Sequence, residues 1–126
     1  MQLSCTSEET QFREEVRAWL RANVPRSKRP RTGLALRDYD LAWQRRQYEG
    51  GWAGISWPRE YGGRGLSLTQ QVIWYEECAA AHAPVGGSTF VGLSHAGLTL
   101  IVRGTEEQKR FHLPKILQGE AVWCQG

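Results

Sequence analysis

Two residues that could bind a metal, Cys78 and His82, stand four positions apart in a segment with helical periodicity. Residues four apart face the same side of a helix, so a thiolate and an imidazole could reach one ion. A zinc site takes three or four protein ligands, however, and no second pair stands at a suitable spacing. We therefore interpret Cys78 as a buried thiol and His82 as a packed side chain, and we expect no metal site.

Two other segments could bind an anion. The Gly-Gly-Arg-Gly stretch at 62–65 would hold a phosphate if it followed a strand and opened a helix. It precedes a predicted helix, but Trp57-Pro58 does not read as a buried strand, so a structural turn is favoured. A basic cluster spans 26–31 and could contact nucleic acid. The net charge is only +3, and we interpret the cluster as a solvated loop between helices, with no nucleic-acid partner.

Catalytic side chains are not apparent in the pattern. The sequence has no serine–histidine–acid arrangement with supporting local sequence. Glu76 and Glu77 are adjacent carboxylates, but neighbours on a helix point about 100° apart and cannot act as a pair on one substrate. We expect one of them to meet an arginine across the helices, and we assign no catalytic residue to this segment.

The composition is typical of a soluble globular protein. Of the 126 residues, 40% are hydrophobic and 23% charged, and no window approaches the roughly 20 apolar residues of a membrane span. The opening segment lacks an apolar signal core and carries early acids, which argues against secretion and organelle import. Three cysteines are an odd number without tight pairing, as expected of reduced thiols. These features favour the cytoplasm.

Helix signals account for most of the chain. Serine or threonine followed three positions later by glutamate or glutamine predicts helix starts at Thr6, Ser67 and Thr105. The first helix ends before Pro25, and 25–37 is predicted to be a loop. A second helix is expected from near Asp38 to Glu49. The aromatic and glycine-rich stretch 50–66 is predicted to be an ordered, packed connection because its tryptophans favour burial.

The last helices are expected at 88–103 and from Thr105 onward. The segment 88–103 is apolar almost all round, which predicts a buried helix. Its glycines, Gly92 and Gly97, each cost about 1 kcal/mol relative to alanine. Either a close neighbouring backbone or a bound ligand would explain them. Pro114 is predicted to begin a separate short turn, because proline inside a helix costs about 3 kcal/mol.

The predicted fold class is therefore all-α. We expect a five-to-six-helix orthogonal or up-down bundle over 1–119, followed at 120–126 by the start of a β-strand at the C-terminal end. Val122 and Trp123 are the residues that suggest a strand.

Several segments, taken in order, resemble the amino-terminal region of acyl-CoA dehydrogenases. They are WP..YGG from Trp57, the later Glu76-Glu77 pair, GT.EQK from Gly104, LP.IL.GE from Leu113 and W.QG from Trp123. Each piece alone is weak, but the ordered set is specific and covers nearly everything from Trp43 onward. Residues 1–42 agree only in being helical.

The resemblance implies one segment of a three-part FAD enzyme that removes two hydrogens from an acyl-CoA thioester. A glutamate base absent from this chain would take the α-proton, and the flavin would take the β-hydride. The serine-glutamate-proline and Gly-Ser-Asp motifs that hold the flavin would follow Gly126, so we expect a truncated segment that is inactive alone. The resemblance implies that the Gln125 side chain contacts the flavin and that the backbone of Gly126 approaches the flavin ring closely. The alternative is that Gln125 is an ordinary strand residue.

The same resemblance places the helix at 88–103 against the acyl pocket. Phe90, Val91, Ser94 and His95 are then the candidates to line it. The implied partners are an acyl-CoA substrate, electron-transfer flavoprotein or a similar acceptor, and other subunits in a homo- or hetero-oligomer. Which acyl group is bound stays open, as does an oxidase that passes electrons to oxygen. The alternative is a non-catalytic helical interaction module, or a split-gene subunit completed by another chain.

Overall fold

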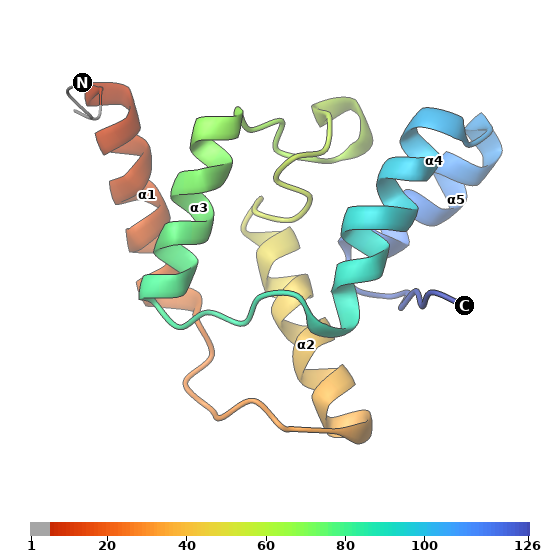
Figure 1. Cartoon of the computed structure of the whole chain (residues 1–126), viewed down its shortest axis with the longest axis horizontal. Coiled ribbons are helices and arrows are strands. Elements are labelled where there is room, and N and C mark those ends of the chain that lie inside the picture. The colour runs from red at the N-terminus through yellow and green to blue at the C-terminus, as the bar shows by residue number, and fades with distance from the viewer. Residues whose placement is uncertain (1–5) are drawn as a thin grey trace.

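A computed structural model describes residues 6–126, and all the regular structure in them is helical (Figure 1). The α-helices are α1 (Ser7–Asn23), α2 (Gly33–Glu49), α3 (Leu68–Ala80), α4 (Gly97–Arg103) and α5 (Glu106–Leu117). Three shorter helical turns are η1 (Arg59–Tyr61), η2 (Gly87–Thr89) and η3 (Gly92–Ala96). Successive α-helices run in alternating directions (Figure 1). The all-α prediction is confirmed.

Three helices begin where their capping residues predict. In each, the hydroxyl of the capping residue accepts a hydrogen bond from the backbone N–H of the residue three positions later. The side-chain oxygen of that later residue accepts a hydrogen bond from the backbone N–H of the capping residue. The pairs are Thr6–Glu9, Ser67–Gln70 and Thr105–Gln108. These local bonds satisfy N–H groups that have no partner inside the helix.

The start of α2 was predicted five residues too late, at Asp38 instead of Gly33. Thr32 makes no side-chain capping bond, so the sequence carries no signature there. A tertiary contact lies about two turns further along the helix. Arg29 in the preceding loop donates two hydrogen bonds of 2.7 Å each to the buried carboxylate of Asp40.

The separate turn predicted at Pro114 is also wrong, because α5 continues through this residue to Leu117. Leu113, Ile116 and Leu117 are all buried on either side of the proline. Burying one such side chain contributes about 1.5–3 kcal/mol, so the three together outweigh the roughly 3 kcal/mol that proline costs.

The interior is divided into two hydrophobic clusters. The first core joins α1, α2 and α3 and contains Phe12, Val16, Leu20, Trp43, Trp52, Ile55, Ile73, Trp74, Cys78 and Ala83. The second core lies under α4 and α5 and contains Ala53, Trp57, Leu113, Ile116 and Leu117. The connection 50–66 supplies Trp52 to the first core and Trp57 to the second. It is ordered and packed, as predicted.

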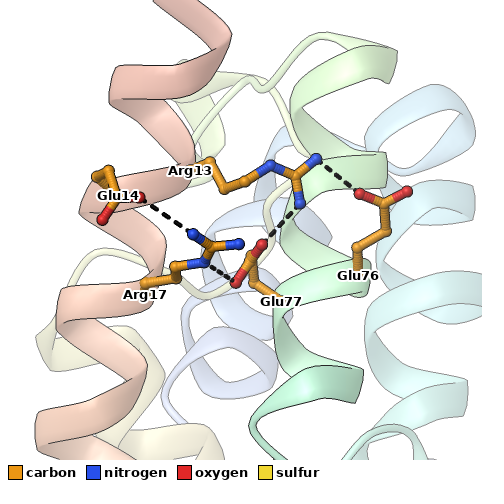
Figure 2. A network of polar contacts seen from close by, with 5 residues as sticks. All are labelled: Arg13, Glu14, Arg17, Glu76 and Glu77. Atoms are coloured by element: carbon orange, nitrogen blue, oxygen red, sulfur yellow. Dashed lines mark hydrogen bonds and ion pairs between the residues drawn. The ribbon is translucent and has the colours of Figure 1, made fainter. Parts of the chain in front are cut away.

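An ionic network joins α1 to α3 (Figure 2). Arg13 donates to Glu77 at 2.6 Å and to Glu76 at 2.7 Å, and Arg17 donates to Glu77 at 2.7 Å. The Glu77 side chain is only 6% exposed. Its burial alone would raise the pKa of this carboxyl, but the two arginines outweigh that effect and the pKa lies below its ordinary value. The expected contact between a glutamate of α3 and an arginine is confirmed.

Residues 120–126 form no strand in this structure. The reason is that a strand is defined by hydrogen bonds to a neighbouring strand, and residues 6–126 offer no such neighbour. The segment is nevertheless held in place. The Trp123 ring contacts the edge of His112 at a centroid distance of 5.3 Å and packs against the second core.

None of the helices in residues 6–126 is both long enough and apolar enough to cross a lipid bilayer.

Candidate functional site

One open hollow of about 550 Å³ brings together residues that are far apart in the sequence. Ser94 and His95 line it from η3, and Gln125 lines it from the carboxy-terminal segment. Leu98, Thr99, Val102 and Arg103 of α4 complete the wall. Three of the predicted site residues therefore share one solvent-facing depression.

The helical segment at this hollow is not buried as predicted. Leu98 is 37% exposed and Val102 is 72% exposed, and both face the hollow. The apolar composition of 88–103 predicts burial, but no element of residues 6–126 covers this face. An exposed apolar wall beside polar groups is typical of a ligand site or a covered interface.

Packing against Trp57 explains the glycines of this segment. A Cβ on Gly97 would overlap the Trp57 ring, and one on Gly92 would lie 3.3 Å from Ile116. The Trp57 indole also donates a 2.9 Å hydrogen bond to the carbonyl of Leu93. That carbonyl belongs to η3, a π-helical turn of the kind often found at functional sites. Trp57 is thus a positioning residue for Ser94 and its neighbours.

A second, more enclosed cavity of about 280 Å³ lies between α2, α3 and the segment 84–94. Phe90 and Ser94 belong to its lining, so Ser94 borders both the hollow and the cavity. Val91 is half-buried and lies outside the lining of both. The structure thus brings Ser94 together with Phe90 on one side and with His95 and Gln125 on the other.

The buried polar side chains of this cavity are already hydrogen-bonded. Asp40 is bound by Arg29, and the amide of Gln44 donates to the carbonyl of Leu117 at 2.9 Å. The Trp43 indole donates to the carbonyl of Pro84 at 2.9 Å. Burial raises the pKa of the Cys78 thiol to about 12, so this thiol stays neutral. What remains free to contact a ligand is a mixed surface, in which Ser56, Tyr75 and Ser94 lie beside aliphatic and aromatic groups.

The carboxy-terminal residues are accessible to a ligand. Gln125 is exposed, and its amide offers both donors and an acceptor. Gly126 adjoins Gln125, and a glycine has no side chain to keep another group away from its backbone. Trp123 fixes the direction in which both residues project, because its ring is held between His112 and the backbone near Gly92.

The glycine-rich stretch at 62–65 is a structural turn. Gly62 has a left-handed φ of 86°, and a Cβ on Gly63 would overlap the backbone of Trp57. The Arg64 guanidinium lies 3.7 Å from the Trp52 ring centroid and also pairs with Glu15. This arginine is therefore committed to packing, which agrees with the favoured interpretation.

The possible metal pair does not converge. Cys78 is buried in the first core, whereas His82 is exposed beyond the end of α3 with a φ of 52°. Over residues 6–126, no three histidine, cysteine or acidic side chains are grouped closely enough to hold an ion. Cys5 lies outside the described residues.

Sequence reasoning missed four residues of the hollow. They are Leu98, Thr99, Val102 and Arg103. A usable signal was present, since these positions follow His95 at intervals of three, four, seven and eight, which share one helix face. The apolar composition of the segment hid this face, because it predicts that Leu98 and Val102 are buried.

The chain is similar to known acyl-CoA dehydrogenases. A family model described as "Acyl-CoA dehydrogenase, N-terminal domain" matches residues 6–120. The acyl-CoA dehydrogenase IpdE1 of Mycolicibacterium smegmatis is 41% identical over 123 residues, covering 92% of this chain and 31% of the relative. This chain thus spans about a third of the length of that relative.

Two solved structures are also similar. The Tcur3481-Tcur3483 steroid ACAD superposes with a TM-score of 0.73 at 34% identity, covering 97% of this chain and 32% of the other. The ChsE4-ChsE5 complex from Mycobacterium tuberculosis gives 0.72 at 30% identity, covering 95% and 30%. Because the family model matches nearly the whole described chain, the protein belongs to the acyl-CoA dehydrogenase family through its amino-terminal domain.

Proposed function

We propose that this chain supplies one wall of the acyl and flavin cavity of an FAD-dependent acyl-CoA dehydrogenase. The reaction is the α,β-dehydrogenation of an acyl-CoA thioester. The observation that carries the proposal is the hollow shared by Ser94, His95 and Gln125 in a chain of this family. Polypeptide corresponding to the remaining two thirds of the relatives would complete the cavity, and the chain alone is expected to be inactive.

The residues present fit a flavin at the carboxy-terminal side of the hollow. The exposed amide of Gln125 can exchange hydrogen bonds with a polar ring edge, and Gly126 beside it carries no side chain that would obstruct a flat ring. FAD, when bound, supplies the acceptor for the hydride that leaves the substrate. In this proposal 1–119 form the helical domain and 120–126 become the first strand of a β-domain. An extended segment anchored by Trp123 is suited to pair with such a strand.

The acyl group is proposed to lie along the segment containing Phe90, Val91, Ser94 and His95. The wall there is part apolar and part hydrogen-bonding, a combination that encloses an aliphatic group and orients its polar end. Leu98 and Val102 extend the apolar surface and become buried once ligand and the rest of the enzyme cover them.

Further partners follow from the family and its solved members. Both similar structures are described with two named chains, so we propose assembly into an oligomer, with a hetero-oligomer tested first. Electron-transfer flavoprotein or a similar acceptor would reoxidise the flavin. The free thiols of Cys78 and Cys124 suit a reducing compartment, and we propose the cytoplasm.

The test is reconstitution. This chain, expressed together with polypeptide that corresponds to the remaining two thirds of its relatives, should give a yellow protein that reduces an artificial electron acceptor with an acyl-CoA. Gln125→Ala should weaken flavin retention by about tenfold, the value of one good hydrogen bond to a charged or strongly polar group. Ala42→Gln on the exposed face of α2 is the matched control and should retain flavin normally.

A folded but colourless and inactive assembly would overturn the proposal. That result would favour the alternative of a non-catalytic helical module that only binds other chains. Flavin binding that is unchanged in Gln125→Ala would leave the family activity standing but remove this residue from the flavin site.

A further inference from the structure

The helical stretch 90–103 is interrupted by one π-helical turn, η3. At this turn the backbone N–H of Gly97 donates to the carbonyl of Gly92, five positions earlier. In a regular α-helix the same N–H would donate to the carbonyl of Leu93, four positions earlier. The stretch contains no proline, and a side chain inserted into the hydrogen-bond ladder is another known cause of such an irregularity.

Trp57 occupies the carbonyl that the π turn leaves without a backbone partner. A helix that passes from i→i−5 to i→i−4 bonding skips one carbonyl. Because α4 is α-helical from Gly97 onward, the skipped carbonyl is that of Leu93. The Trp57 indole donates to this oxygen at 2.9 Å, in a partly buried position where an unpaired carbonyl would be costly. The indole N–H thus takes the place of the Gly97 N–H.

We propose that the Trp57 N–H selects the π register of this helix and thereby sets how the residues of the candidate site face. Without the indole donor, the Leu93 carbonyl would lack a partner. The Gly97 N–H would then move to it and close a regular α-helical turn. The bearing of this inference on the acyl site rests on the proposed function, whereas the register itself is a property of this chain.

The register decides how the two halves of the helix face relative to each other. A π turn holds one more residue than an α turn, and each residue of an α-helix turns the chain by about 100°. Loss of the π turn would therefore rotate Phe90 and Ser94 by about 100° relative to Leu98. In this structure Ser94 shares the hollow with Leu98 and the enclosed cavity with Phe90. The α register would break up that arrangement.

Gly97 is what allows the indole to reach the helix backbone. A Cβ at this position would overlap the Trp57 ring. Trp57 is 1% exposed and belongs to the second core, so the donor comes from a fixed side chain. The ring could act as a wedge even without its N–H, and the test must separate these two contributions.

The experiment measures couplings across hydrogen bonds by NMR in the isotopically labelled full chain. In the unaltered chain, the Gly97 nitrogen should couple to the carbonyl carbon of Gly92, and the Trp57 indole nitrogen should couple to that of Leu93. Trp57→Phe keeps an aromatic ring but removes the donor. In this variant the Gly97 nitrogen should couple to Leu93 instead of Gly92.

Trp43→Phe is the matched control. Trp43 is also buried, at 4% exposure, and its indole also donates to a backbone carbonyl, that of Pro84, at 2.9 Å. This variant should keep the coupling between Gly97 and Gly92. Gly97→Ala is a second test variant, should Trp57→Phe fail to fold. Its Cβ would displace the indole from the Leu93 carbonyl, so the nitrogen at position 97 should again couple to Leu93.

Three results would overturn the inference. The first is a coupling of Gly97 to Leu93 in the unaltered chain, since no π turn would then exist. The second is a persisting coupling to Gly92 in Trp57→Phe, or in Gly97→Ala if that is the variant that folds, because the indole N–H would then not set the register. The third is the same switch in Trp43→Phe. All couplings are measured without flavin or substrate, so a colourless, inactive assembly would remove the proposed function and leave the register assignment standing.

Discussion

The ionic network of α1 and α3 makes a specific prediction for Glu77→Gln. The Glu77 carboxylate is 6% exposed and accepts one hydrogen bond from each of two arginines, at 2.6 and 2.7 Å. The amide that replaces it has no charge and only one acceptor oxygen. Removing one partner of a fully buried ion pair costs about 3–5 kcal/mol. The arginine side chains are 23% and 41% exposed and can rehydrate, so we expect a loss of about 2 kcal/mol in the free energy of unfolding.

The measurement is urea unfolding followed by circular dichroism at pH 7. With a denaturant slope of about 2 kcal/mol per molar, the midpoint should move down by about 1 M. Glu14→Gln is the matched control, because Glu14 also pairs with Arg17, at 3.1 Å, but its side chain is 63% exposed. A pair of this kind contributes less than about 0.5 kcal/mol, so the control midpoint should barely move.

Two results would refute this reasoning. One is a Glu77→Gln midpoint equal to that of the unaltered chain, since the buried carboxylate would then contribute nothing net. The other is an equal shift in both variants, because the difference in exposure between Glu77 and Glu14 would then be irrelevant to their contributions.

Three further predictions concern stability and reactivity. The pKa of Glu77 is lowered in the folded state, so the stabilisation from its carboxylate is present above the ordinary value of 4.5 and is lost as the pH falls below it. The free energy of unfolding, measured by urea titration at decreasing pH, should therefore fall less steeply in Glu77→Gln than in the unaltered chain. Gly97→Ala should lower the free energy of unfolding by about 2 kcal/mol in urea titrations, because its Cβ overlaps the Trp57 ring; a gain from helix propensity would contradict this packing. Iodoacetamide with peptide mapping should label exposed Cys124 in the native chain, and label Cys78, whose pKa is raised to about 12, only after unfolding.

Local signals in the sequence predicted the helices well. The three capping boxes are contacts within four residues, and each is formed as expected. The errors arose where a distant contact decides the outcome. α2 begins at Gly33 without a side-chain cap that a local pattern could reveal, and α5 continues through Pro114 where its neighbours are buried in the second core. Neither can be read from a short window.

The candidate site was predictable only in part and for a different reason. Ser94 and Gln125 are 31 positions apart, and no periodicity links them. Their association was suggested by resemblance to a family and is a matter of tertiary structure. The exposure of Leu98 and Val102 was missed because composition shows that a helix is apolar but not which chain covers it.

The division of the interior into two cores has a consequence for cooperativity. The connection 50–66 supplies Trp52 to the first core and Trp57 to the second, so one short segment belongs to both. Neither cluster can then come apart without releasing a tryptophan anchor of the other. Heating should therefore give a single transition, in which tryptophan fluorescence and far-UV circular dichroism change at the same temperature.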